Sequence, residues 1–201
     1  LVHGVGDGNI HVGQAHGIKV DEFLVVFAAG DLAGEDVNQV AVDIGVGDVI
    51  VPNAQRRNIQ TKLDGYEKPE ILTYSLESTI AEKFDAILQR FELTGRMKDF
   101  YDIYYLSRAF DFDGLKLQTA IQETLQNRGT AYEKDSFDRI LALADDPDMQ
   151  TKWRYFLKTL GNPDMPFADV IAGLKVFLLP AWDAIIAEEE LHKNWLSANC
   201  I

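Results

Sequence analysis

The segment Tyr74–Leu106 constrains the fold more than any other part of the chain, because it combines helical apolar spacing with an unusual set of charges. Apolar side chains recur at intervals of three and four residues on both sides of a short break at Glu92–Gly95. This spacing predicts a hairpin of two helices. Ser75 is the expected N-cap of the first helix, with Ser78 as a later alternative, and the helix runs to about Arg90. The second helix is expected from about Met97 to Ala109.

Lys83 stands among apolar residues of the first predicted helix. An unpaired buried ammonium is costly, so Lys83 should find a carboxylate or a phosphate. Asp99 and Asp102 are three residues apart and therefore share one face of the second helix. The alternative for Lys83 is to extend to solvent or to form a purely structural salt bridge with Asp99. The alternative for Asp102 is a bond to the neighbouring helix.

Arg96, just before the second predicted helix, has two possible roles. It is a candidate ligand-binding cation, and it is also well placed to pair locally with Asp99, where an acid favours the helix dipole. The two roles do not exclude each other.

The overall charge limits the classes of partner. The 201 residues carry a formal net charge of −13, so most of the surface repels nucleic acid and anionic membranes. A basic cluster in the segment 53–69 is the place where such a chain could meet RNA phosphate, and its alternative is a solvated loop. The cluster comprises Arg56, Arg57, Lys62 and Lys68.

The cysteine count and the hydropathy limit the cellular compartments and the kinds of site that we expect. Cys200 is the single cysteine, which excludes an internal disulfide framework and a cysteine-based metal site. A reducing, cytoplasmic location is the corresponding expectation. No uninterrupted apolar run reaches the roughly 18 residues that a membrane span needs.

The remaining segments divide into a β-rich part and a helical part. Val40–Pro52 has a strong β pattern, Phe23–Ala29 fits one buried strand, and Ile71–Tyr74 fits a short extended piece. Asn53–Pro69 is predicted to be a loop. After Phe112 the pattern is helical, and the three tryptophans are expected in the core. The predicted helices are Leu115–Arg128, Lys134–Ala144, Met149–Thr159, Ala168–Leu178 and Ala181–Leu196, and the tryptophans are Trp153, Trp182 and Trp195.

Three motifs in one order resemble the AbiEii/AbiGii family of abortive-infection toxins, which are nucleotidyltransferase-like proteins. The strand VDIGVGD (Val42–Asp48) is similar to the family's IDIGFGD. Tyr74–Glu77 followed by Ala81–Lys83 is similar to YPLE…AEK, and Arg96–Asp102 is similar to RxKDxYD. Together the motifs cover about residues 40 to 110.

The resemblance implies an α+β fold, in which a small, truncated nucleotidyltransferase-like sheet precedes a mostly helical C-terminal domain. The expected organisation is an atypical N-terminal segment at 1–39, the nucleotidyltransferase-like core with the helical hairpin at 40–110, and a helical domain at 111–201. The implied activity is transfer of a nucleotide from an NTP to an acceptor such as tRNA. The implied biological role is the toxin of a type IV toxin–antitoxin pair, with a cognate antitoxin as partner.

The resemblance also implies roles for individual residues. Lys83 is the phosphate-contacting lysine, Asp99 is the acid of the second helix, and Asp43 is a carboxylate presented by the core strand and the candidate ligand for Mg²⁺. The other side chains expected at the nucleotide-binding cleft are Glu77, Arg96 and Lys98. For Asp43 the alternative is to cap a turn at Gly45 and Gly47.

The chain departs from the family pattern upstream of Val40. The family's glycine-serine turn and its Asp-x-Asp pair, which form the primary metal site, are not recognisable in residues 1–39. Truncation, a shift of reading frame and divergence would each explain the difference. The alternative function is therefore a catalytically inactive relative that acts as a protein-binding module. An unrelated helical interaction domain with a small sheet is the third hypothesis.

Overall fold

The computed structural model describes residues 24–25, 44–45, 54–58, 68–90, 95–161 and 163–197. It divides the chain into two units, Leu1–Asp48 and Val49–Ile201. In the first unit, strand β1 (Leu24–Val25) pairs antiparallel with β2 (Ile44–Gly45), with Leu24 opposite Gly45. Both short strands lie inside segments predicted to be strands. The other residues of those segments, Asp43 among them, lie outside the described part of the chain.

A second antiparallel pair precedes the helices. Strands β3 (Gln55–Asn58) and β4 (Glu70–Thr73) pair with Gln55 opposite Thr73. The extended piece near residues 71–74 is thus confirmed, whereas the loop predicted for 53–69 is wrong at 55–58. The four residues of β3 are polar and exposed, so no apolar alternation indicated a strand, and pairing with β4 determines their conformation. Within β3, Arg56 forms an exposed ion pair with Glu70 at 2.7 Å.

The predicted helical hairpin is present as α1 (Leu76–Arg90) and α2 (Met97–Ala109). Ser75 caps α1 as expected, since its Oγ accepts a hydrogen bond of 3.0 Å from the amide of Ser78. Ile80, Phe84 and Ile87 at helical spacing are at most 1% exposed and form the buried stripe of α1. The α+β class with a small sheet followed by helices is therefore confirmed.

The remaining helices begin and end at recognisable signals. Helix α3 (Gly114–Arg128) is capped by Asp113 and stops at Gly129, which adopts the left-handed conformation at φ 63°. Helix α5 (Pro147–Thr159) is capped by Asp146 and has its proline in the first turn. Between them lie α4 (Ser136–Ala142) and the short 3₁₀ turn η3 (Leu143–Asp145).

One long helix, α6 (Phe167–Ala187), replaces the two helices expected at 168–178 and 181–196. It continues through Pro180 because apolar residues before and after the proline are buried in the same core. It ends where Glu188 turns left-handed, at φ 56°. The prediction of a helix to Leu196 is wrong, because Trp195 instead forms an antiparallel bridge with Phe112. Three consecutive glutamates at 188–190 would also oppose the helix dipole at that end.

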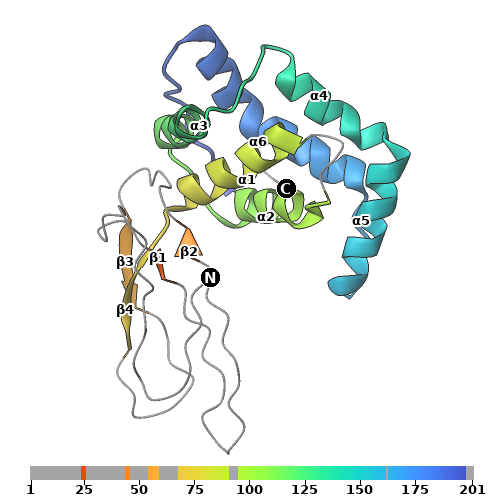
Figure 1. The fold of residues 1–201 in the computed structure, drawn as a ribbon, viewed down its shortest axis with the longest axis horizontal. Helices are drawn as coiled ribbons and strands as arrows, with labels where there is room; N and C mark the ends of the chain where they lie inside the picture. Colours follow the sequence, from red (N-terminus) through yellow and green to blue (C-terminus); the bar gives the residue numbers. More distant parts are fainter. Residues whose placement is uncertain are drawn as a thin grey trace, which may run out of the picture. The chain divides into compact units, whose positions relative to one another are not determined.

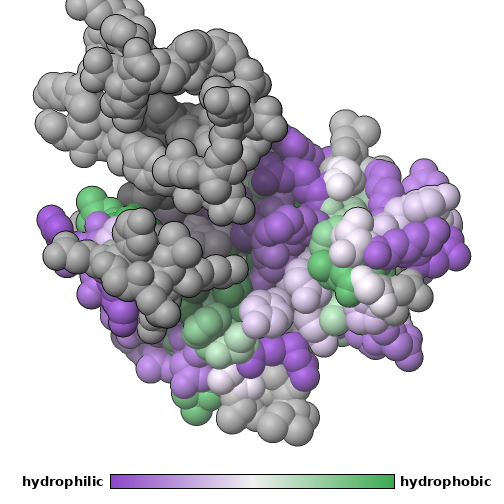
Figure 2. Space-filling view, turned by 90° about the horizontal axis from the view of Figure 1, so that it is seen from below, coloured by the Kyte–Doolittle hydropathy of each residue, from purple (hydrophilic) through white to green (hydrophobic). Residues whose placement is uncertain are grey.

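The six α-helices of the described residues enclose one hydrophobic core, with α1 packed between α2 and α3, and α6 behind them (Figure 1). Phe84 meets Trp182 edge to face at 5.8 Å, and Trp153 and Trp182 are at most 2% exposed, which confirms them as core residues. Trp195 is partly buried against the same core. In the described helical region, the surface seen in Figure 2 is mostly hydrophilic, with hydrophobic areas between the charged ones.

Helix α6 is the single helix among the described residues that is long and apolar enough to cross a membrane by those criteria alone. The burial of its side chains gives another explanation for its apolar composition. Val170, Leu174, Leu178 and Ala181 form a stripe that is at most 1% exposed, and this stripe packs against the other helices. The apolar character of α6 is thus that of a central core helix.

Candidate functional site

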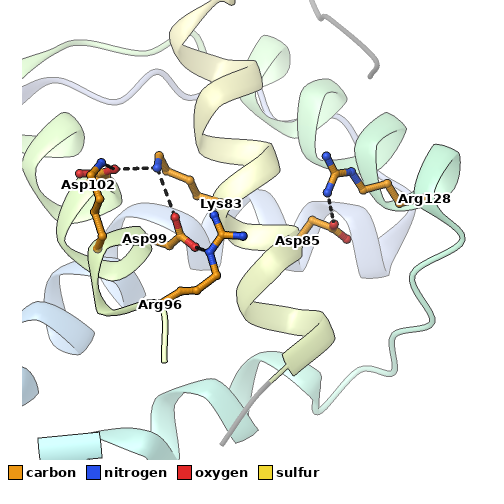
Figure 3. Close-up of polar contacts among 7 residues, drawn as sticks. Lys83, Asp85, Arg96, Asp99, Asp102 and Arg128 are labelled. Carbon is orange, nitrogen blue, oxygen red and sulfur yellow. Dashed lines mark hydrogen bonds and ion pairs between the residues drawn. The ribbon is translucent and has the colours of Figure 1, made fainter. Parts of the chain in front are cut away.

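Lys83 and two aspartates form an ion-pair cluster between α1 and α2 (Figure 3). The Nζ atom of Lys83 lies 2.6 Å from Asp102 Oδ2 and 3.3 Å from Asp99 Oδ1. The Lys83 side chain is 19% exposed and that of Asp99 is 3% exposed. Because the two aspartates are one turn apart on α2, a single ammonium from α1 reaches both.

Two further cations complete this cluster at the start of α2, Arg96 just before the helix and Lys98 in its first turn. Arg96 Nε lies 2.6 Å from Asp99 Oδ2, which is shielded from solvent and has this guanidinium as its ionic partner. Lys98 Nζ lies 2.5 Å from Asp102 Oδ2. The buried carboxylate of Asp99 is therefore held between Lys83 and Arg96, and the more exposed carboxylate of Asp102 between Lys83 and Lys98.

The electrostatics of the cluster favour an additional anion. Three cations face two carboxylates, so these five side chains together carry a net positive charge in an otherwise acidic chain. Burial raises the pKa of Asp102, but hydrogen bonds from Lys83 and Lys98 and the charges of both lysines outweigh it and lower the pKa below its usual value. Asp102 therefore remains ionised and keeps Lys83 in place.

The structure brings together four of the residues predicted for the site. Lys83, Asp99, Arg96 and Lys98 converge as expected, and both the local Arg96–Asp99 pair and the Asp102 bond to the neighbouring helix are also present. Glu77 lies in the first turn of α1 and is not a partner of Lys83. Asp43 lies outside the described residues. The functional roles of all these side chains stay predictions.

The described carboxylates do not make a magnesium site. No group of three or more metal-ligating side chains occurs in the part of the chain that the structure describes. Asp99 and Asp102, the acids nearest Lys83, are both occupied by cations, which repel a divalent ion. A metal at this site would need ligands from outside the described ranges.

A pocket opens beside the cluster, and the three lining residues that α5 contributes were not predicted from the sequence. The pocket has a volume of about 430 Å³ and lies between the start of α2 and α5. Arg96 and Lys98 belong to both the cluster and the pocket. The full lining is Gly95, Arg96, Met97, Lys98, Lys152, Tyr155 and Phe156. The exposed aromatic–basic spacing of α5 is the signal that could have indicated Lys152 and Tyr155.

A second polar cluster lies on the opposite side of α1, facing Arg128 (Figure 3). Asp85 is fully buried and accepts hydrogen bonds from Gln89 Nε2 at 3.0 Å, from Arg128 Nη1 at 3.4 Å, and from Thr130 Oγ1. Arg128 also pairs with Glu82. Because both carboxylate oxygens of Asp85 have partners within the fold, we interpret this cluster as a structural link between α1 and the end of α3. A charged residue in the apolar stripe of α1 was its only sequence signal.

Comparison with known proteins adds the family. The family model described as "Nucleotidyl transferase AbiEii toxin, Type IV TA system" matches residues 4–188, which is most of the chain. The match includes most of the segment 1–39, where the motifs showed no resemblance. The curated proteins and the solved structures gave no significant match.

Proposed function

The chain belongs to the AbiEii family of nucleotidyl transferase toxins of type IV toxin–antitoxin systems, and we propose that it transfers a nucleotide from an NTP to a nucleic-acid acceptor such as tRNA. Membership of the family implies a cognate antitoxin. The location that suits this activity is the cytoplasm, where NTPs and tRNA are found.

The observation that carries the proposal is the position of Lys83. Its ammonium is held by Asp99 and Asp102 at a place where Arg96 and Lys98 add positive charge. In nucleotidyl transfer an acceptor hydroxyl oxygen bonds to the α-phosphorus, the bond from that phosphorus to the bridging oxygen breaks, pyrophosphate leaves, and the hydroxyl proton is lost to solvent. Negative charge grows on the phosphate oxygens during this step, and positioned cations stabilise it.

In this proposal each residue has a distinct task. Lys83 contacts the triphosphate, while Asp99 and Asp102 orient its ammonium. Arg96 and Lys98 add charge at the edge of the same site. The family's activity generally depends on a divalent metal, and Asp43 remains the sequence's candidate ligand for Mg²⁺. Glu77 stays a candidate for the nucleotide site on the family motif alone.

The experiment is label transfer from radiolabelled NTPs to total tRNA in the presence of Mg²⁺. We expect labelled tRNA with the wild-type protein and its loss with Lys83→Ala. Lys116→Ala, which changes an exposed lysine on α3, is the matched control. A folded wild-type protein that transfers no label from any of the four NTPs would contradict the proposal.

One observation favours the second candidate, an inactive relative that works by binding a partner protein. Both described acids beside Lys83 are already neutralised by cations, as a purely structural cluster would have them. This candidate predicts that NTPs cause no thermal shift and that Lys83→Ala leaves toxicity unchanged. Thermal shift with each NTP therefore separates the two candidates before any acceptor is known.

A further inference from the structure

The pocket between α2 and α5 has the composition of an anion site. Its lining includes Arg96, Lys98 and Lys152, and no acidic side chain is among the described residues that line it. Arg96 keeps its ion pair with Asp99 through Nε, which orients the guanidinium at the pocket's edge. Lys152 comes from α5, a helix that the family motifs do not cover. Three cations around a volume of about 430 Å³ suit a phosphate with its sugar and base.

An exposed aromatic ring adds a second kind of contact. Tyr155 of α5 lines the pocket and is 64% exposed, which is unusual for so large a side chain in a helix with a well-buried face. Lys158 Nζ lies 4.8 Å from the centre of the Tyr155 ring. Lys152, Tyr155 and Lys158 follow one another at intervals of three residues, so they share one side of α5 and extend over about 9 Å. Cations interleaved with an aromatic ring are typical of surfaces that bind single-stranded nucleic acid.

We infer that this pocket and the adjoining side of α5 bind a single-stranded segment of nucleic acid, with phosphates on Arg96, Lys98 and Lys152 and one base stacked on Tyr155. The inference rests on the proposed function, because the bound strand would be the acceptor. It deepens that function by assigning acceptor binding to α5. Arg96 and Lys98 connect the two sites, since they pair with the same aspartates that hold Lys83.

A strand fits these residues better than a free nucleotide does. One nucleotide occupies one pocket, whereas the cations continue along α5 past Tyr155 to Lys158. The chain as a whole is strongly acidic, with a net charge of −13, so an RNA strand gains little by spreading over acidic faces. A local basic stripe is then the surface on which phosphate contacts can offset the repulsion.

The test is binding of a short, fluorescein-labelled single-stranded RNA to the full chain, measured by anisotropy over a series of salt concentrations. We expect Tyr155→Ala to weaken binding roughly five-fold to a hundred-fold, as loss of one base stack does. Tyr155→Phe should retain it. Lys152→Ala should reduce the slope of log affinity against log salt by about 0.7, the value for one phosphate contact on a single strand. Lys116→Ala on α3 should change neither quantity.

Two outcomes overturn the inference. One is absence of RNA binding by the folded wild-type protein, and the other is RNA binding by Tyr155→Ala and Lys152→Ala that equals wild type. A separate arm titrates NTP alone and follows the thermal shift. If Tyr155→Ala abolishes the NTP shift while RNA binding persists, the pocket serves the free nucleotide and the strand assignment is wrong.

Label transfer measured in parallel separates this inference from the proposed function. If the wild-type protein transfers no label but binds RNA in a Tyr155-dependent way, the proposed function is contradicted and the RNA-binding site on α5 is supported. If the wild-type protein transfers label efficiently and Tyr155→Ala binds RNA as well as wild type, only the RNA-binding site on α5 is contradicted. Circular dichroism of each variant confirms that it is folded; the exposed position of Tyr155 and the partly exposed position of Lys152 on α5 make this the expected result.

Discussion

Lys83 on α1 and Asp102 on α2 are joined by a contact of 2.6 Å between Nζ and Oδ2, with 19% of each side chain exposed. The contact ties the two helices of the hairpin together and fixes an ammonium within reach of solvent. A salt bridge in this position resists a change of helix spacing, and an incoming phosphate can still approach the ammonium. The same geometry therefore serves stability and the proposed chemistry.

Replacement of Lys83 by alanine should affect both properties. We expect label transfer to fall by about 10²-fold to 10³-fold, the usual cost of removing one positioned donor at a reacting group. The free energy of unfolding should fall by about 1–3 kcal/mol, because Asp99 is buried and loses one of its two cations. Urea unfolding and initial transfer rates measure the two effects. Transfer at the wild-type rate by Lys83→Ala would show that Lys83 takes no part in the reaction.

Lys98→Ala is the stability control for that experiment, because Lys98 pairs with the same acid. Its side chain is 71% exposed, so the pair with Asp102 should contribute less than about 1 kcal/mol to the free energy of unfolding. A loss as large as that of Lys83→Ala would show that burial does not decide the strength of these pairs.

The pH dependence of stability should report Asp102. The pKa of its carboxyl in the folded protein lies below the ordinary 3.8, since the lysine contacts outweigh the effect of burial. A group of this kind stabilises the fold above its unfolded pKa and loses that contribution as the pH falls through the folded pKa. We expect Asp102→Asn to lower stability near pH 7 and to lessen the further loss below about pH 4.

The measurement is urea unfolding at a series of pH values, with Asp164→Asn as the control because Asp164 is an exposed aspartate. Identical acid limbs for the wild type and Asp102→Asn would rule out this linkage. The relevant comparison is the difference between variants, because acid unfolding generally depends on many carboxyl groups.

Local patterns determined which parts of the fold could be predicted. The bounds of α1 and α2 and the convergence of Lys83 with Asp99 follow from helical spacing within one hairpin. The approach of Tyr155 to Arg96 depends on how α5 packs against α2, and no local period encodes a contact between segments so far apart in the chain. Helix α6 was divided wrongly at Pro180 for a similar reason, because burial on both sides of the proline outweighs its local effect.

Asp85 should be essential to the fold and unconnected with the chemistry. Its carboxylate is fully buried and accepts hydrogen bonds from Gln89, Arg128 and Thr130. Asp85→Ala removes one buried acceptor from all three donors, and we expect the free energy of unfolding to fall by about 2–4 kcal/mol. The control is Glu70→Ala, which breaks an exposed pair with Arg56 and should cost less than about 1 kcal/mol. If the two variants unfold alike, the Asp85 cluster contributes no more than a surface pair.

Gly114→Ala should loosen the chain segment that follows α6. A methyl group on Gly114 would lie 2.1 Å from the carbonyl oxygen of Lys193, and this neighbour is backbone that cannot rotate away. The Gly114 amide also donates to Asn194 Oδ1 at 3.1 Å, and the Trp195 amide donates to the Phe112 carbonyl at 2.9 Å. The clash therefore displaces a segment held by several bonds, and we expect a loss of about 1–3 kcal/mol in the free energy of unfolding.

A smaller effect of opposite sign acts at the same position, because alanine forms helices better than glycine by roughly 0.5–1 kcal/mol. Gly95→Ala provides the matched comparison, since a methyl group there meets no heavy atom within 4 Å and should be close to neutral. Hydrogen exchange at the Trp195 amide locates the damage: it should accelerate in Gly114→Ala and stay unchanged in Gly95→Ala. Equal stability and equal exchange in the two variants would mean that residues 193–195 can move aside freely, and the Phe112–Trp195 bridge would then be too weak to hold the segment in place.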